Sequence, residues 1–319
     1  MSDALQRDTT PSPPQGFEGS EPDEEVIDDG EEVLEDLGQR WTTLGELGNT
    51  LPLAVGPDRS FSFKTMNLDL RAKVSEVLDK HRQRETATGL ATFAIAASLE
   101  SMQGQDVAGA KLEEIVALLR QLPWTSVTFV TYQLQLAKMA GEDTMQLGQR
   151  KCTLCGRPHR NAVASLRSMR VRAYGQLEQL PEETLELYDG LRFGGKVASQ
   201  VTIRPARWDF MARLADGNLE KAPVVLRSAL RSAICRLDSH EGIVTPDEAA
   251  LGGLSERDID LLDREHTLLS GGPLSVVEAQ CQGHTWPVLY PWQSAAFFGG
   301  SRDRRSRRMS GRGKTSSPR

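Results

Sequence analysis

Two short segments, 129 residues apart, contain residue types that bind metal ions. Residues 151–159 read KCTLCGRPH, and residues 280–287 read QCQGHTWP. When one is laid on the other without a gap, Cys152 matches Cys281 and Cys155 matches His284. Thiolate and imidazole are the ligands that zinc prefers, and each pair could supply half of a tetrahedral site. We therefore predict one structural zinc ion held by these four residues.

The first segment has the form of a zinc knuckle, a tight turn whose backbone N–H groups point at sulfur. Gly156 relieves the sterics of such a turn, and the neighbouring Lys and Arg side chains favour thiolate over thiol. His159 is a spare ligand that could replace His284. The alternatives are a second knuckle that has lost its metal, a Cys-x-x-Cys redox pair, or plain burial of the cysteines.

The other residues of chemical interest lack ligand spacing. Cys235 lies in an apolar stretch, and we expect it in the core. His81, His240 and His266 have charged neighbours and are expected at the surface. The carboxylates of 258–265 are spread around a helix and are expected to be solvated. The chain has no serine-nucleophile elbow, no phosphate-binding glycine loop and no His-Glu-x-x-His motif, so we predict that it is not an enzyme.

The chain has an acidic beginning and a basic end. Residues 1–36 hold thirteen Asp or Glu and one Arg, whereas residues 301–319 hold seven Arg, one Lys and one Asp. Such segments bury too little apolar surface to offset their ordering entropy. We assign 1–44 as an acidic disordered tail and 301–319 as a basic disordered tail, which could bind nucleic acid.

Cysteine content and hydropathy limit the cellular compartments in which the protein could work. Four cysteines in 319 residues are too few for a disulfide scaffold. No apolar run approaches the ~20 residues that a membrane helix needs, and the N-terminus has no signal-peptide pattern. We expect a soluble protein that works in a reducing cytoplasm, without membrane contact.

Two modules of similar order must position the ligands. The first, 45–173, begins with a hairpin in which 51–55 pairs with 61–66. Helical patterns follow at 68–84, 89–101 and 111–122, and then from a cap at Thr125 or Ser126 to Met139. The first knuckle comes after these helices.

The second module, 182–300, repeats that order. Tyr188–Phe193 and Lys196–Ile203 flank Gly194-Gly195, which is a hairpin signal. Helical patterns follow at 208–214 and 224–237, and a further helix begins at a Ser255 cap. The second knuckle closes this module.

The ends of the modules suggest an internal duplication. Residues 132–152 and 261–281 align without a gap, and each copy reads helix, glycine break, short strand, knuckle and strand. Chance is the alternative, because few aligned residues are identical. The predicted fold class is α+β, with two related modules that each contain a β-hairpin, helices and a small zinc-ribbon-like β element.

Aromatic residues crowd the end of the second module. Trp286, Trp292, Phe297 and Phe298 lie close together in the sequence. A concentrated aromatic patch at the edge of a domain is a common interface anchor, so we predict these residues as partner-binding. Packing onto the core of the second module is the alternative.

The second half of the chain resembles a known family. A hairpin ending in Val201–Pro205 leads to a helix with Asp209 near its start, and later come Ser255–Asp258, a strand and the second knuckle. This order resembles the baseplate-hub assembly and tail-assembly chaperone proteins of contractile-tail bacteriophages, over 185–300 and more faintly over 45–170. Their pattern has a glycine that this chain lacks between Arg204 and Asp209, and a Cys where His284 stands.

The resemblance implies a non-enzymatic assembly factor or minor structural protein of a phage tail. Its partners would be tail or baseplate proteins, and its location the host cell cytoplasm during assembly or the virion. The alternative is a zinc-ribbon nucleic-acid-binding regulatory protein that uses the basic residues around the first knuckle and the C-terminal tail.

Overall fold

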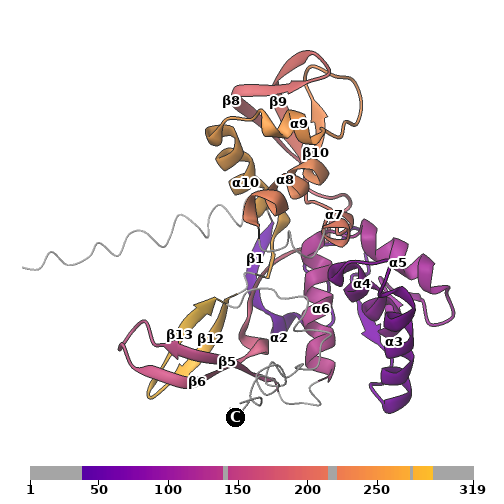
Figure 1. The fold of residues 1–319 in the computed structure, drawn as a ribbon, viewed down its shortest axis with the longest axis vertical. Coiled ribbons are helices and arrows are strands. Elements are labelled where there is room, and N and C mark those ends of the chain that lie inside the picture. The colour runs from indigo at the N-terminus through magenta and orange to yellow at the C-terminus, as the bar shows by residue number, and fades with distance from the viewer. Residues whose placement is uncertain (1–37, 139–142, 215–220, 274–275, 290–319) are drawn as a thin grey trace, which may run out of the picture.

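The computed structural model describes residues 38–138, 143–214, 221–273 and 276–289, and these form a mixed α+β protein with several small antiparallel sheets (Figure 1). The helices are α2 (Leu44–Leu47), α3 (Leu68–His81), α4 (Ala87–Ser98), α5 (Leu112–Gln121), α6 (Trp124–Lys138), α7 (Asp209–Arg213), α8 (Ala222–Ala233), α9 (Glu248–Gly252) and α10 (Glu256–Ser270). Within the described ranges, none of them combines the length and the apolar character that a membrane span requires. The predicted α+β class is confirmed.

The strands are short and fall into four sheets among the described residues. They are β1 (Gln39–Thr43), β2 (Phe61–Phe63), β3 (Leu99–Met102), β4 (Gln105–Asp106), β5 (Thr144–Lys151), β6 (Pro158–Ser165), β7 (Arg170–Tyr174), β8 (Glu183–Phe193), β9 (Lys196–Ile203), β10 (Ile234–Leu237), β11 (Gly272–Pro273), β12 (Val276–Cys281) and β13 (His284–Leu289). The 3-10 turn Leu166–Ser168 joins β6 to β7.

We call the part of the structure that shares one hydrophobic cluster, from Leu44 to Ala173 and from Val277 to Val288, the main body, and helix α6 lies at its centre. Val127, Phe129 and Tyr132 are all fully buried, and the helix is buried on most of its surface, its threonines and Gln133 included, because neighbours surround it. Figure 1 shows α6 between β1 and the helices α3 to α5. The helix begins at Trp124, so Thr125 does not cap it; its hydroxyl instead donates a hydrogen bond to Ser270 O (3.0 Å).

The predicted first hairpin is wrong. Strand β2 pairs with β3, placing Phe61 opposite Met102, and 51–55 forms no strand beside it. Leu51 and Leu53 are fully buried, so their apolar character reflects core packing rather than strand pairing. Alternation over a few residues marks burial, and it does not select the partner strand.

Strands near the end of the described chain pair with strands of the first predicted module. Strand β11 pairs with β7, which also pairs with β1, and β12 pairs with β6. Val277, Ala279 and Trp286 belong to the same hydrophobic cluster as Leu44 and Phe129. We call the four-stranded sheet β13-β12-β6-β5 the ribbon. Both predicted knuckles therefore lie in one sheet.

Residues 183–270 include a separate unit, which we call the lobe. It consists of the sheet β10-β9-β8 and the helices α8 to α10, with a core of its own that includes Leu191, Val201 and Leu262. The hairpin predicted at Gly194-Gly195 is confirmed, since Phe193 pairs with Lys196 across the two glycines. Both glycines have positive φ (+56° and +78°), as a two-residue turn between twisted strands requires.

Helix α10 both confirms and corrects the sequence interpretation. Ser255 caps it as predicted, accepting a hydrogen bond from Asp258 N. Asp258 is not solvated: it is fully buried, and its carboxylate accepts hydrogen bonds from Tyr188 N (2.7 Å) and Asp189 N (3.1 Å). His266 is also buried, within hydrogen-bond distance of Ala206 N (3.3 Å) and Ser270 Oγ (3.1 Å). Both errors arise because this face of the helix packs on the protein.

Candidate metal centre

The first knuckle is the turn between β5 and β6. Cys152 N donates to Arg157 O (2.9 Å) and Gly156 N donates to Cys152 O (3.0 Å), which closes the loop on itself. Gly156 has φ +71°, a left-handed conformation that explains the glycine at this position. The backbone N–H groups of Leu154 and Cys155 point at the Cys152 thiol. The predicted knuckle geometry is therefore present.

The second knuckle is simpler, because it is the tip of a two-residue hairpin. Cys281 lies directly opposite His284 in the β12–β13 pair, with Gln282 and Gly283 forming the turn. Gly283 has φ +83°, as such a turn demands. Residues directly opposite each other in an antiparallel pair present their side chains on the same face. The hairpin thus aligns a thiol and an imidazole without further support.

The ribbon brings the two knuckles together. Strand β12 pairs with β6 at Ala279 and Ala164, and Arg157 in the first turn donates a hydrogen bond to Gln282 in the second. Cys152 Sγ lies 3.1 Å from His284 Nε2, and Cys155 Sγ lies 3.7 Å from Cys281 Sγ. All four ligand atoms lie within 4.8 Å of one another.

The donor set and the spacing fit a zinc ion. With Zn–S bonds of about 2.3 Å, two sulfurs of a tetrahedral site are separated by about 3.8 Å, close to the observed sulfur–sulfur distance. Three thiols and one imidazole are ligands that zinc accepts in structural sites. The cluster of Cys152, Cys155, Cys281 and His284 could therefore hold a metal ion such as zinc.

The cysteines differ in their readiness to ionise. Burial by itself raises the pKa of Cys152, but hydrogen bonds from His284 and from the backbone of Cys155 and Leu154 outweigh it and lower the pKa to about 6. Burial raises the pKa of Cys281, and its contact with Cys155 raises it further. Metal binding to such a site releases protons, because each thiol must become a thiolate.

His159, the predicted spare ligand, lies outside the cluster. Its ring stacks on Trp286 with 4.9 Å between centroids and 28° between the planes. Trp286 is 1% exposed and belongs to the main core, so the core-packing alternative describes this residue better than a partner-binding surface. Trp292, Phe297 and Phe298 lie outside the described residues.

Cys235 is separate from the metal-ligand group, as the sequence predicted. It is buried in β10, within hydrogen-bond distance of Thr202 O (3.3 Å). Burial, and then the nearby Glu182 carboxylate, raise the pKa of its thiol. Its environment is that of an inert core cysteine.

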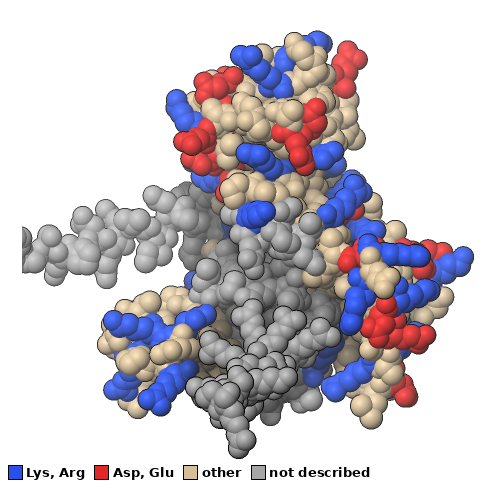
Figure 2. Space-filling model, in the orientation of Figure 1, with Lys and Arg blue, Asp and Glu red and all other residues tan. Residues whose placement is uncertain are grey.

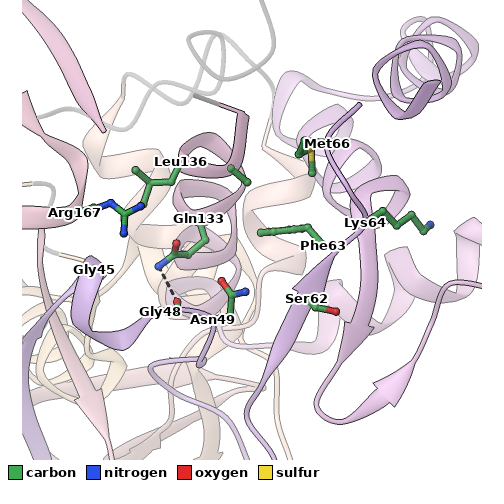
Figure 3. Close-up of a pocket in the computed structure, with 11 residues that line it drawn as sticks. Gly45, Gly48, Asn49, Ser62, Phe63, Lys64, Met66, Gln133, Leu136 and Arg167 are labelled. Carbon is green, nitrogen blue, oxygen red and sulfur yellow. Dashed lines mark hydrogen bonds between the residues drawn. The ribbon is translucent and has the colours of Figure 1, made fainter. Parts of the chain in front are cut away.

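A cavity of about 730 Å³ lies between α2, β2 and α6. Gln133 bridges one wall by donating to Leu44 O (2.8 Å) and Gly48 O (2.7 Å), and the second bond is drawn in Figure 3. The described residues that line the cavity include Lys64 and Arg167 but no Cys, His, Asp or Glu.

Sequence reasoning missed the two features that follow from long-range packing. One is the hydrogen bond between Arg157 and Gln282, which ties the knuckles together. The other is the Asp258 anchor of the lobe, for which the Ser255-x-x-Asp258 spacing was the available signal. Searches of family models, curated proteins and solved structures return no match to this chain.

Proposed function

We propose that this chain is a non-enzymatic assembly or minor structural protein that acts by protein–protein contacts, with one structural zinc ion clamping its two halves. The observation that carries the proposal is the Cys₃His cluster. Its two pairs of ligands lie 129 residues apart in the sequence. Four protein ligands leave no open coordination position for a substrate or a reactive water. A site of this kind contributes folding energy rather than chemistry.

The expected partners are tail or baseplate proteins, as the resemblance over 185–300 implies. The ribbon is the part that a metal would hold rigid, and the aromatic residues Trp292, Phe297 and Phe298 follow it directly in sequence. A rigid platform followed by aromatic anchors is a suitable arrangement for docking to another protein. Assembly of such partners would take place in a host cell cytoplasm.

A second candidate function is nucleic-acid binding, which one observation favours. Arg150, Lys151, Arg157 and Arg160 are all exposed on the ribbon, and Glu278 is the single acidic residue in its strands and turns. In Figure 2 the ribbon projects at the lower left, and its visible face carries Lys and Arg but no Asp or Glu. Cations of this kind attract phosphate backbones, and the attraction falls steeply with salt.

The first experiment is elemental analysis of protein purified without chelator, beside a Cys281→Ser variant. About one zinc per chain, reduced in the variant, supports a shared site. A complex with co-expressed tail or baseplate proteins that survives ~0.3 M salt supports the assembly function. Retention on DNA at ~0.1 M salt that is lost at ~0.3 M and in a Lys151→Gln/Arg160→Gln variant favours the second function. Failure of both binding assays would contradict both.

A further inference from the structure

A small cavity of about 290 Å³ lies where the lobe joins the main body. Its lining includes Arg204, Arg207, Arg213 and Arg231, together with the hydroxyl residues Ser228 and Ser232. Figure 2 shows Lys and Arg side chains around the position of α7, between the lobe and the helices α3 to α5. The cavity shares no residue with the metal centre.

The arginines are held by the segment that links the two units. Arg204 N donates to Ala233 O (3.0 Å), which fixes the segment to the lobe. Arg207 N donates to Ser232 Oγ (3.1 Å), and its guanidinium donates to Gln121 Oε1 on α5 (2.8 Å). Trp208 N donates to Leu122 O (2.8 Å) on the main-body side. The positions of Arg204 and Arg207 are thus set from both sides of the junction.

The charges of this cavity are not balanced. Among the described residues, Asp209 is the only carboxylate that lines it, and Arg213 already pairs with it at 2.7 Å. Within the part of the chain that the structure describes, Arg204, Arg207 and Arg231 have no carboxylate at ion-pair distance. Arg204 Nε is buried without a hydrogen-bond partner. Burial, and then the neighbouring Arg204, lower the pKa of Arg207.

We propose that this cavity binds the phosphate group of a small phosphorylated ligand. Guanidinium groups match phosphate oxygens with paired hydrogen bonds, and an anion would also satisfy the buried Arg204 Nε. Several unpaired cations suit a phosphate dianion better than a carboxylate, which carries one charge. Arg204 and Arg207 are half-buried, so an anion bound between them would offset part of the cost of removing their charges from water.

An adjoining cavity gives room for the organic part of the ligand. It has a volume of about 320 Å³ and shares Gln121, Asp209 and Arg213 with the first. Phe93, Val116 and Ala117 contribute apolar surface to it. The two cavities together have the size and mixed character of a site for a nucleotide-sized molecule. This inference does not depend on the proposed assembly function.

The test is calorimetric titration of the zinc-loaded full chain at constant ionic strength with three probes: inorganic phosphate, AMP and adenosine. We expect AMP and phosphate to bind at one site, AMP more tightly, and adenosine not to bind. Arg204→Gln and Arg231→Gln should each weaken AMP binding by about tenfold or more. Arg227→Gln, an exposed arginine on α8 outside the cavity, is the charge-matched control and should bind normally.

Folding is checked separately. Arg231 is exposed, and its side chain makes no hydrogen bond or ion pair with the described residues, so Arg231→Gln should melt at the same or a higher temperature without phosphate. Absence of binding by every probe, or equal weakening in Arg227→Gln, overturns the proposal. Equal affinity for phosphate and AMP keeps the phosphate site and overturns the role of the adjoining cavity.

Discussion

The ribbon and the lobe are both built from antiparallel hairpins, but they are stabilised in different ways. The lobe packs long aliphatic side chains such as Leu191, Leu230 and Leu262 between its sheet and its helices. The described buried positions of the ribbon are three alanines (Ala162, Ala164 and Ala279) and five larger residues (Leu147, Cys152, Val277, Trp286 and Val288), and all of them belong to the core of the main body rather than to a core of the ribbon's own. Burial contributes roughly 25 cal/mol per Å² of apolar surface, so small side chains contribute little. We infer that the ribbon depends on the proposed metal ion, whereas the lobe depends on its core and its buried polar groups.

Loss of the metal tests this contrast most strongly. Cys155→Ser, or treatment with a chelator, should destabilise the ribbon by about 5 kcal/mol or more, because a structural zinc supplies folding energy directly. Hydrogen exchange should accelerate in β5, β6, β12 and β13 and remain slow in α10. Thr153→Ser, on the same turn, is the control and should retain both metal and protection. Equal acceleration in ribbon and lobe would remove the contrast.

The lobe should respond instead to loss of the Asp258 anchor. Asp258→Ala removes the buried carboxylate that accepts from Tyr188 N and Asp189 N, and loss of these two charge-assisted hydrogen bonds should cost about 4 kcal/mol. Urea denaturation measures the loss, and zinc content should not change. Asp260 is exposed and lies two residues after Asp258, on another face of the same helix. The stability of Asp260→Ala should therefore stay within about 0.5 kcal/mol of that of the parent protein. A similar loss in both variants would show that helix charge, not the anchor, is responsible.

The lobe should also be sensitive to acid through His266. Burial lowers the pKa of His266 to about 4, below its ordinary value of about 6.5. As pH falls, the unfolded chain takes up this proton first, so the contribution to stability is complete above about pH 6.5 and is lost toward about pH 4. The loss should approach about 3 kcal/mol. The free energies of unfolding of the parent protein and of His266→Gln, measured by denaturation at each pH, should converge as the pH falls through that window. A difference that does not change with pH would count against the assignment.

The smallest expected effect distinguishes packing from ligation within the ribbon. His159→Ala removes the stack on Trp286 and should cost about 1 kcal/mol, the value of an aromatic contact. Zinc content should remain at the parent level, because His159 lies outside the cluster. Loss of metal in this variant would instead make His159 a ligand, as the spare-ligand interpretation allowed.

Local patterns predicted the four residues that cluster as a possible metal site, and several elements, correctly. Each knuckle is a short turn whose geometry depends on adjacent residues, so Cys-x-x-Cys-Gly and Cys-x-Gly-His could be read directly. The Gly194-Gly195 hairpin and the Ser255 cap are local in the same sense. The hairpin expected at 51–66 failed, because a buried irregular segment and a half-buried strand give the same alternation over so few residues.

By itself, the sequence determined which residue types could bind a metal, where the chain turns and where α10 begins. These properties depend on side-chain chemistry and on backbone preferences over a few residues. Tertiary structure alone decided that β12 pairs with β6, that Asp258 and His266 are buried, and that Arg204 and Arg207 meet Arg231 at one cavity. Such contacts join residues far apart in the chain, and their free energy depends on which surfaces pack together, which local patterns do not specify.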